Sequence, residues 1–327
     1  MAVRSTRRTG RRRTPAEPAA AVRKARATGA ELAAEVLRVR DAALAKRRRA
    51  VQERRVATAR PRAAVATPAR IAAAGGAARA GVVVAEGDSW FDFPWRDVLS
   101  LLEDQHGYDV ESVAHRGDRV EDMAYGGGQL EELCRLLERL LRRGEVPRAI
   151  LLSGGGNDVA GSEFSLLLEH ARSPRPGLNE DVVRGVLEQR VRDAFVTLIE
   201  SVTQVARARV GAVVPILVHG YARPVPDGRG FLGGWGPFPG PWLEPGFRQK
   251  GFEDLAVTRA IAADLIDRFN AMLQGVAALP AFAHVRYLDL RPTLSNGADY
   301  RTWWSDELHP TKRGFEAVAR RFAAAIP

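Results

Sequence analysis

The sequence has only one cysteine among its 327 residues, so it can form neither an intramolecular disulfide framework nor a cysteine-rich zinc site. Cys134 falls in an amphipathic helical pattern, which predicts a thiol that packs in the core. Long apolar runs are also missing. No stretch approaches the ~18 residues of a membrane-spanning helix, and the arginine-rich N-terminus lacks the apolar segment of roughly 7–15 residues of a signal peptide. We therefore predict a soluble, cytoplasmic protein without a transmembrane segment.

Aromatic residues are absent from residues 1–81, and acidic residues are rare there. This segment carries 21 Lys and Arg against 5 Asp and Glu, whereas the rest of the chain carries 28 against 34, a net charge of −6. A segment without large apolar side chains has little to bury, so we predict a basic extension that is disordered or partly helical. Residues 30–55 are rich in helix formers, and Leu32, Val36 and Val39 form a short apolar stripe.

The positive charge of this extension fits non-specific binding to a polyanion, such as nucleic acid or an anionic membrane surface. However, no aromatic side chains alternate with the arginines to stack on bases. A plain solvated extension explains the same composition, so both interpretations stay open.

From residue 82 onward, apolar runs alternate with helical periodicity. Strands are predicted at residues 82–85, 110–114, 149–152, 216–219 and 285–290. Helices are predicted at residues 96–105, 130–143, 181–209, 254–278 and 310–325. Strands separated by helices imply parallel crossovers and a sheet that is covered on both faces. The pattern predicts one α/β domain, residues 82–327, with a three-layer α/β/α architecture.

Residues 224–251 interrupt this alternation with 6 prolines and 8 glycines in 28 residues. The segment also contains five large aromatic residues, whose exposure in a disordered loop would be unfavourable. A loop of this length is usually functional, so we predict an ordered lid or pocket wall. Its Trp235 and Trp242 are candidates for the substrate pocket.

Four short motifs follow the predicted strands, and together they supply the groups of a serine hydrolase. Ser89, in a Gly-Asp-Ser-Trp sequence after the first strand, is the candidate nucleophile, and His309 is the candidate general base. Asp306 lies three residues before His309 and can hold the imidazole in the tautomer that the reaction needs. Because the carboxyl ends of parallel strands share one edge of the sheet, these residues can meet there.

Acyl transfer also needs donors for the negative charge that develops on the carbonyl oxygen. The backbone N–H groups of Ser89 and Gly117 and the side-chain amide of Asn157 are the candidates for this oxyanion hole. Glycine at position 117 lets the backbone approach the oxygen without a Cβ in the way.

These residues resemble the SGNH hydrolase superfamily, also called GDSL esterases and lipases, whose four name-giving positions match Ser89, Gly117, Asn157 and His309. The resemblance covers the whole predicted domain. It implies a flavodoxin-like sheet of five parallel strands and a serine esterase that needs no metal or cofactor. The implied substrate is a small-molecule ester, such as a lysophospholipid, a thioester, a simple acyl ester or an acetylated sugar.

Several side chains near these motifs have open roles. Trp90 replaces the leucine of the family motif, which changes the pocket wall, and Trp304 either lines the pocket or packs in the core. His115 and His219 lie near strand ends and can face the cleft, although a hydrogen-bonded structural role is the more common one.

Other assignments fit the sequence less well. The Gly-x-Ser-x-Gly signature is absent, and Ser153, the nearest match, lacks the leading glycine. The three glycines at 154–156 are not followed by the Lys-Ser/Thr pair of a phosphate-binding loop. No pair of histidines has the spacing of a metal site on a helix. The competing hypothesis is a polyanion-binding protein that is docked by residues 1–81 and carries a non-catalytic hydrolase-like scaffold.

Overall fold

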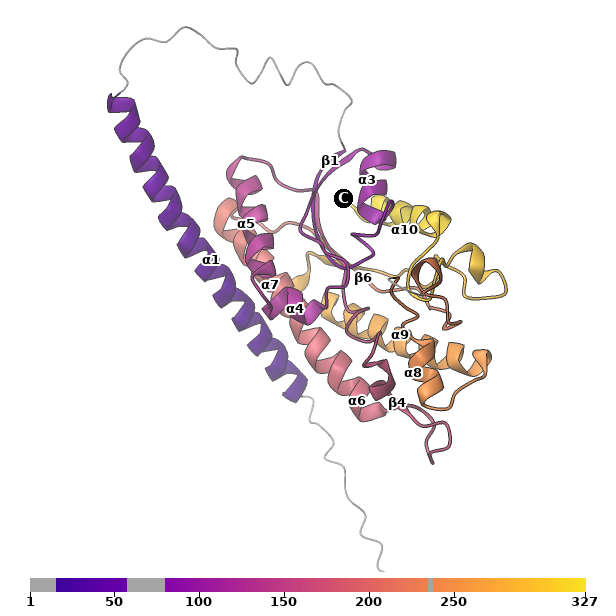
Figure 1. The fold of residues 1–327 in the computed structure, drawn as a ribbon. Helices are drawn as coiled ribbons and strands as arrows, with labels where there is room; N and C mark the ends of the chain where they lie inside the picture. Colours follow the sequence, from indigo (N-terminus) through magenta and orange to yellow (C-terminus); the bar gives the residue numbers. More distant parts are fainter. Residues whose placement is uncertain (1–15, 58–79, 235–237) are drawn as a thin grey trace, which may run out of the picture.

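The computed structural model describes residues 16–57, 80–234 and 238–327, and its centre is a five-stranded parallel sheet (Figure 1). The strands are β1 (Gly81–Glu86), β2 (Tyr108–Ser112), β3 (Ala149–Leu152), β6 (Ile216–His219) and β7 (Val285–Leu288). Their spatial order is β2-β1-β3-β6-β7, which is the flavodoxin-like order. Each strand lies where the sequence predicted one. All residues of β3 and β6 are buried, as expected for inner strands that helices cover on both faces.

Helices form a layer on each face of this sheet (Figure 1). On one face, α3 (Val98–His106) packs against α10 (Lys312–Ala325). The other face is covered by α4 (Val120–Tyr125), α5 (Gln129–Arg142), α7 (Arg192–Val210) and α9 (Leu255–Ala277). Right-handed crossovers explain the division, because the step from β1 to β2 crosses the sheet in the opposite direction to the later steps. The predicted three-layer α/β/α architecture is confirmed.

Shorter elements complete the fold. α6 (Glu180–Gly185), a π-helical turn (Val186–Val191) and α7 form one continuous helical run, where the sequence predicted a single helix. The remaining short elements are the hairpin strands β4 (Leu168–Glu169) and β5 (Gly177–Leu178), α8 (Glu244–Gln249), and 3₁₀ turns at Phe164–Leu167, Phe231–Gly233, Pro280–Phe282 and Tyr300–Thr302. In the part of the chain that is described, no helix combines the length and apolar character needed to cross a membrane.

The basic extension forms a long helix, α1 (Ala16–Ala57), that lies along α7 and α5 outside the helical layer (Figure 1). Of the short apolar stripe in this segment, Val36 is buried, whereas Leu32 and Val39 are exposed. The helix instead buries a row of mostly small residues: Ala25, Gly29, Ala33 and Val36. The helical part of the extension is therefore longer than predicted. It packs on the α/β domain through a face that has little hydrophobic area.

Small side chains let α1 and α7 approach closely. A Cβ at Gly29 would lie 2.6 Å from the carbonyl oxygen of Thr197. The Ser201 hydroxyl donates to the carbonyl oxygen of Gly29 (2.9 Å), and Arg26 Nε donates to the Glu200 carboxylate (2.7 Å). Close backbone contact and polar side chains thus replace the large apolar residues that the extension lacks.

The outer face of α1 stays basic. Arg23, Lys24 and residues 46–49 are exposed along it. The polyanion-binding role of the extension therefore keeps its electrostatic basis and stays a prediction. Residues 1–15 and 58–79, which carry further positive charge, lie outside the described residues.

We predict that Gly29→Val destabilises the protein. The new side chain would meet the backbone of α7, and overpacking of a tight interface typically costs about 1–3 kcal/mol. Urea unfolding followed by circular dichroism measures the effect, with Ala27→Val on the exposed side of the same helix as the control. Equal stability of the two variants would show that α1 does not pack on α7 through Gly29.

Candidate active site

Ser89 lies at the carboxyl end of β1, in a tight turn. The Asp88 carboxylate accepts a hydrogen bond from the backbone N–H of Trp90 (3.0 Å), which closes the turn around Ser89. Gly87 passes so close to the neighbouring chain that a Cβ there would lie 2.7 Å from the Cβ of Ser153. The glycine and the aspartate of the motif therefore shape the turn that presents the serine hydroxyl at the edge of the sheet.

His309 and Asp306 form a hydrogen-bonded chain with Ser89. His309 Nε2 lies 2.9 Å from Ser89 Oγ, and His309 Nδ1 lies 2.9 and 3.0 Å from the two carboxylate oxygens of Asp306. Asp306 Oδ1 also accepts from the backbone N–H groups of Leu308 (2.9 Å) and His309 (2.8 Å). A carboxylate at Nδ1 selects the tautomer whose Nε2 can accept the serine proton.

The residues predicted for the oxyanion hole line the same cleft as Ser89 and His309. Gly117 follows β2 with a φ of +88°, a conformation that side-chain-bearing residues rarely adopt. Asn157 follows β3, and its amide nitrogen donates to the carbonyl oxygen of Asp118 (2.9 Å). An amide has two N–H donors, so this hydrogen bond orients the group and uses only one of them.

Residues 80–317 match the model of the GDSL-like lipase/acylhydrolase family. The chain belongs to this family. It is therefore an ester-hydrolysing enzyme of the esterase and lipase type, and the resemblance to SGNH hydrolases that the four motifs indicated is confirmed.

Three solved structures are similar to the enzyme at low sequence identity. A lipase from a goat rumen metagenome is 14% identical with a TM-score of 0.46, and the match covers 75% of this chain and 97% of that one. For an acetyl-xylooligosaccharide esterase from Geobacillus, the identity is 13%, the TM-score 0.42 and the coverage 76% and 94%. An extracellular lipase from Streptomyces rimosus is 17% identical with a TM-score of 0.44, and the match covers 75% of this chain and 100% of that one. No curated protein matches the sequence.

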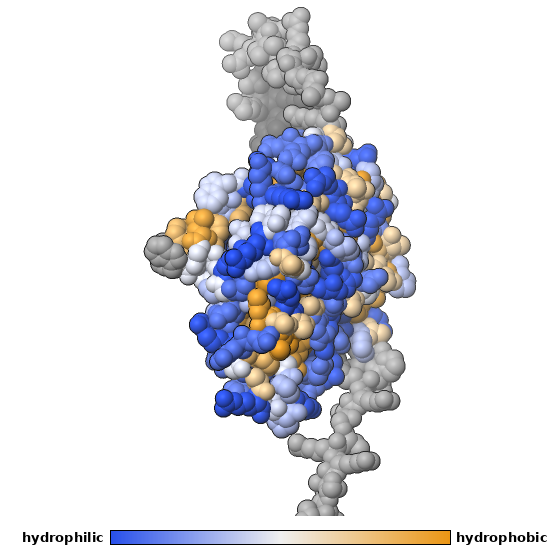
Figure 2. Space-filling model, turned by 90° about the vertical axis from the view of Figure 1, so that its right-hand side faces the viewer, coloured by the Kyte–Doolittle hydropathy of each residue, from blue (hydrophilic) through white to orange (hydrophobic). Residues whose placement is uncertain are grey.

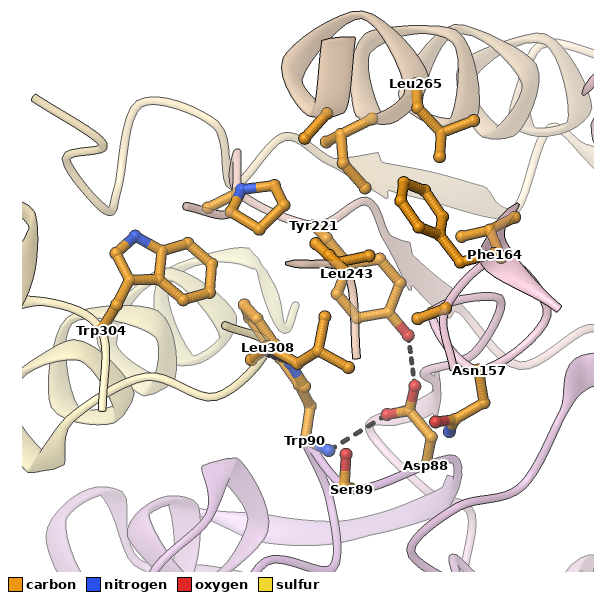
Figure 3. Close-up of a pocket in the computed structure, with 17 residues that line it drawn as sticks. Asp88, Ser89, Trp90, Asn157, Phe164, Tyr221, Leu243, Leu265, Trp304 and Leu308 are labelled. Atoms are coloured by element: carbon orange, nitrogen blue, oxygen red, sulfur yellow. Dashed lines mark hydrogen bonds between the residues drawn. The ribbon is translucent and has the colours of Figure 1, made fainter. Parts of the chain in front are cut away.

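Ser89 lies between two cavities of the enzyme. The first is narrow and apolar, has a volume of about 50 Å³, and extends from Ser89 to α9 (Figure 3). Its larger lining residues are Trp90, Phe164, Tyr221, Leu243, Leu265 and Trp304. The second is an open cleft of about 330 Å³ beside His309. Its larger lining residues are Phe93, Arg116, Phe231 and Trp242.

Three of the four predicted pocket tryptophans lie at these cavities. Trp90 and Trp304 line the narrow cavity, so both pack in the core and form the pocket wall. Trp90 Nε1 also donates to the carbonyl oxygen of Leu308 (3.1 Å), which connects the turn at Ser89 to the loop that carries Asp306 and His309. Trp242 lines the cleft, with its ring centroid 5.2 Å from that of the His309 imidazole. Trp235 lies outside the described residues.

Two side chains of the site carried no motif, and the sequence reasoning missed them. The Phe93 ring stacks on His309 with ring centroids 4.4 Å apart. Tyr221 lines the narrow cavity and donates its hydroxyl to the Asp88 carboxylate. Only the position of Tyr221 just after β6, at the edge where the other strands end, could have indicated it.

The insertion at residues 224–251 forms one wall of the cleft through Phe231 and Trp242. The face shown in Figure 2 is largely hydrophilic, and hydrophobic side chains gather there in limited areas. Exposed hydrophobic residues of the insertion include Leu232 and Phe238. The described parts thus serve as a pocket wall, and movement as a lid stays a prediction.

A second Ser/His/Asp cluster lies beneath the turn that carries Ser89. Ser153 Oγ donates to Asp88 Oδ1 (2.8 Å) and lies 2.8 Å from His219 Nε2. Ser153 and His219 are buried and line neither cavity, and burial lowers the pKa of His219 to about 4. A hydroxyl can donate one hydrogen bond, and Ser153 donates its hydrogen bond to the Asp88 carboxylate and not to His219. This cluster therefore supports the turn, and His219 does not face the cleft.

The thiol of Cys134 and possible metal-binding clusters were the other candidates for reactive groups. Cys134 is buried, and burial raises its pKa to about 12, so the thiol packs in the core as predicted. Within the residues that the structure describes, no group of three or more His, Cys, Asp and Glu side chains could hold a metal ion.

We predict that His219 lowers the stability of the enzyme as the pH falls. In the unfolded chain the imidazole takes up a proton near pH 6.5, but in the folded chain only near pH 4, so acid favours unfolding between these values. The stability lost at pH 4 approaches about 3 kcal/mol. The measurement is the urea unfolding free energy of the wild type minus that of His219→Gln, across this range. A difference that does not change with pH would contradict the assignment.

Proposed function

We propose that the enzyme hydrolyses carboxylic esters of short, linear acyl groups through an acyl-enzyme on Ser89. The observation that carries the proposal is the hydrogen-bonded chain from Ser89 through His309 to Asp306, at the junction of the two cavities. The narrow cavity takes the acyl group, and the open cleft takes the alcohol.

The first half of the reaction transfers the acyl group to the enzyme. Ser89 Oγ attacks the carbonyl carbon while its proton passes to His309 Nε2. The carbonyl oxygen becomes negative and is held by the backbone N–H groups of Ser89 and Gly117 and the amide of Asn157. When the ester bond breaks, the leaving alcohol takes the proton from His309, and Asp306 stabilises the imidazolium meanwhile.

The second half releases the acid. A water molecule enters the cleft after the alcohol has left, gives a proton to His309 and attacks the acyl carbon. The bond to Ser89 Oγ breaks, the serine recovers its proton from the imidazole, and the carboxylic acid leaves. The same three side chains thus serve both halves, and the proton count is unchanged at the end.

The size of the narrow cavity supports a short acyl group. A volume of about 50 Å³ holds roughly three to five water-sized groups at about 10–15 Å³ each, which suits a chain of a few carbons. Branched or long acyl groups would need Leu265 or Phe164 to move, and both are buried. Among the ester classes considered, simple acyl esters fit this cavity better than the long chain of a lysophospholipid.

We predict that a fluorophosphonate probe labels the wild type and Ser153→Ala but not Ser89→Ala. The probe reacts with a serine that a neighbouring base activates, and among the serines that the structure describes only Ser89 has such a base beside a cavity. Gel fluorescence after labelling and hydrolysis of p-nitrophenyl butyrate are the measurements. Labelling that persists in Ser89→Ala and disappears in Ser153→Ala would show that the nucleophile is Ser153 of the buried cluster and not Ser89.

We predict that Leu265→Ala shifts the preference towards longer acyl groups. Figure 3 places Leu265, on α9, at the far end of the cavity from Ser89, so the substitution lengthens the cavity. Each methylene that gains burial is worth about 0.8 kcal/mol, or roughly fourfold in kcat/KM. The ratio of kcat/KM for p-nitrophenyl hexanoate to that for the butyrate measures the shift, since it is independent of the folded fraction.

The control for this experiment is Leu255→Ala, which changes an exposed leucine of the same helix. Its ratio should equal that of the wild type. An unchanged ratio in Leu265→Ala would place the acyl group outside the narrow cavity while leaving the role of Ser89 intact.

A further inference from the structure

Glu307 lies inside the catalytic loop, between Asp306 and His309, and its side chain is fully buried. The carboxylate points away from the triad and towards the insertion. Its four hydrogen bonds all come from backbone N–H groups: Oε1 accepts from Gly228 (3.0 Å) and Glu244 (3.0 Å), and Oε2 accepts from Trp242 (2.6 Å) and Leu243 (2.7 Å). One side chain thus holds two separate stretches of the insertion.

The stretches that Glu307 holds are residues 227–234 and 238–244, which we call the strap. Apart from one 3₁₀ turn and the start of α8, the strap has no regular secondary structure. Its position depends on contacts with the catalytic loop. Arg229 adds to these, because its Nη1 donates to the carbonyl oxygens of Trp304 (2.9 Å) and Ser305 (2.9 Å), and its own carbonyl oxygen accepts from the Glu307 N–H (3.2 Å).

The strap carries the aromatic wall of the cleft. The Trp242 ring forms a T-shaped contact with His309, and Phe231 packs on Phe93 with ring centroids 5.4 Å apart. Phe93 in turn stacks on the imidazole of His309, with ring centroids 4.4 Å apart. The leaving alcohol therefore meets aromatic rings whose positions depend on the strap.

The chemistry of the contact requires a carboxylate. Burial raises the pKa of Glu307, and the N–H groups of Leu243, Gly228, Trp242 and Glu244 act in the opposite direction by stabilising the charged form. A glutamine at position 307 would keep one acceptor oxygen, but its NH₂ group would face two of the four backbone N–H donors. Those N–H groups would then be buried without partners, which favours release of the strap.

We propose that Glu307 is a positioning residue that clamps the strap onto the catalytic loop and so builds the subsite for an aromatic or apolar leaving alcohol. The leaving-group part of the proposal rests on the proposed function, whereas the clamp itself does not. Glu307 touches no reacting atom and acts through Trp242 and Phe231.

The first test compares two esters that share an acyl group, p-nitrophenyl butyrate and ethyl butyrate. Glu307→Gln should lower the ratio of their kcat/KM values roughly tenfold, the effect of about 1.4 kcal/mol of lost contact, and mainly through KM of the aromatic ester. Glu307→Asp keeps both acceptor oxygens and should recover part of the ratio. Because acylation by either ester uses the same triad, a general loss of activity cancels in the ratio.

The matched control is Glu138→Gln. Glu138 is also fully buried, but its carboxylate pairs with Arg40 of α1 (3.2 Å) and Arg209 of α7 (3.3 Å), away from the cleft. Its substitution should lower stability and leave the ratio unchanged. An unchanged ratio in Glu307→Gln, or an equal drop in Glu138→Gln, would overturn the leaving-group subsite.

The second test measures the clamp without using catalysis. Trypsin should cleave after Arg229 faster in Glu307→Gln than in the wild type, because the strap is released. Trp242→Ala should lower the ester ratio without faster cleavage, since it removes a ring and keeps the clamp. Equal cleavage rates in Glu307→Gln, Glu307→Asp and the wild type would overturn the clamp, whatever the labelling of Ser89 shows.

Discussion

Buried carboxylates that accept hydrogen bonds from the backbone fix the catalytic loops of this enzyme. Asp88 closes the turn around Ser89, Asp306 accepts hydrogen bonds from the backbone of the loop that carries His309, and Glu307 holds the insertion. A carboxylate taken out of water is costly unless donors surround it, and an unpaired backbone N–H is costly as well. Each therefore stabilises the other, and loops without regular secondary structure acquire one geometry. Asp306 also contacts His309 Nδ1 (2.9 and 3.0 Å) and so orients the imidazole, which lies 2.9 Å from Ser89 Oγ.

The sequence was sufficient to predict the sheet, most of its helices and the close approach of Ser89, His309 and Asp306. Apolar runs alternating with helical periodicity identify strands and crossovers, and the flavodoxin-like topology then brings their carboxyl ends to one edge. Ser89, Asn157 and His309 each follow a strand, so the motif order and the topology together place them in one cleft. Local pattern was enough here because each functional residue is positioned by the strand that immediately precedes it or by the helix that follows it.

The sequence was insufficient where a contact depends on shape or on distant partners. α1 buries Ala25, Gly29 and Ala33, and small residues of this kind do not form an apolar stripe in a sequence pattern. Glu307 bonds to N–H groups more than sixty residues earlier in the chain, and backbone donors leave no signature in the side chains. Phe93 stacks on the imidazole only because the turn after Ser89 returns towards the histidine loop.

In the proposed reaction, the two sides of the ester bond meet different parts of the fold. The narrow cavity is walled by α9 and by buried residues such as Phe164 and Trp304, whose movement would disturb the core. The cleft is walled by the strap, which is held to the body mainly by hydrogen bonds to one loop. Leu243 is the buried residue of the strap that lines the narrow cavity, and changes elsewhere in the strap alter the alcohol side at little cost to the core, whereas changes on the acyl side are constrained by packing. This division predicts a stricter selection of the acyl group than of the alcohol, because a rigid cavity rejects extra volume and a wall held by few contacts adapts to it.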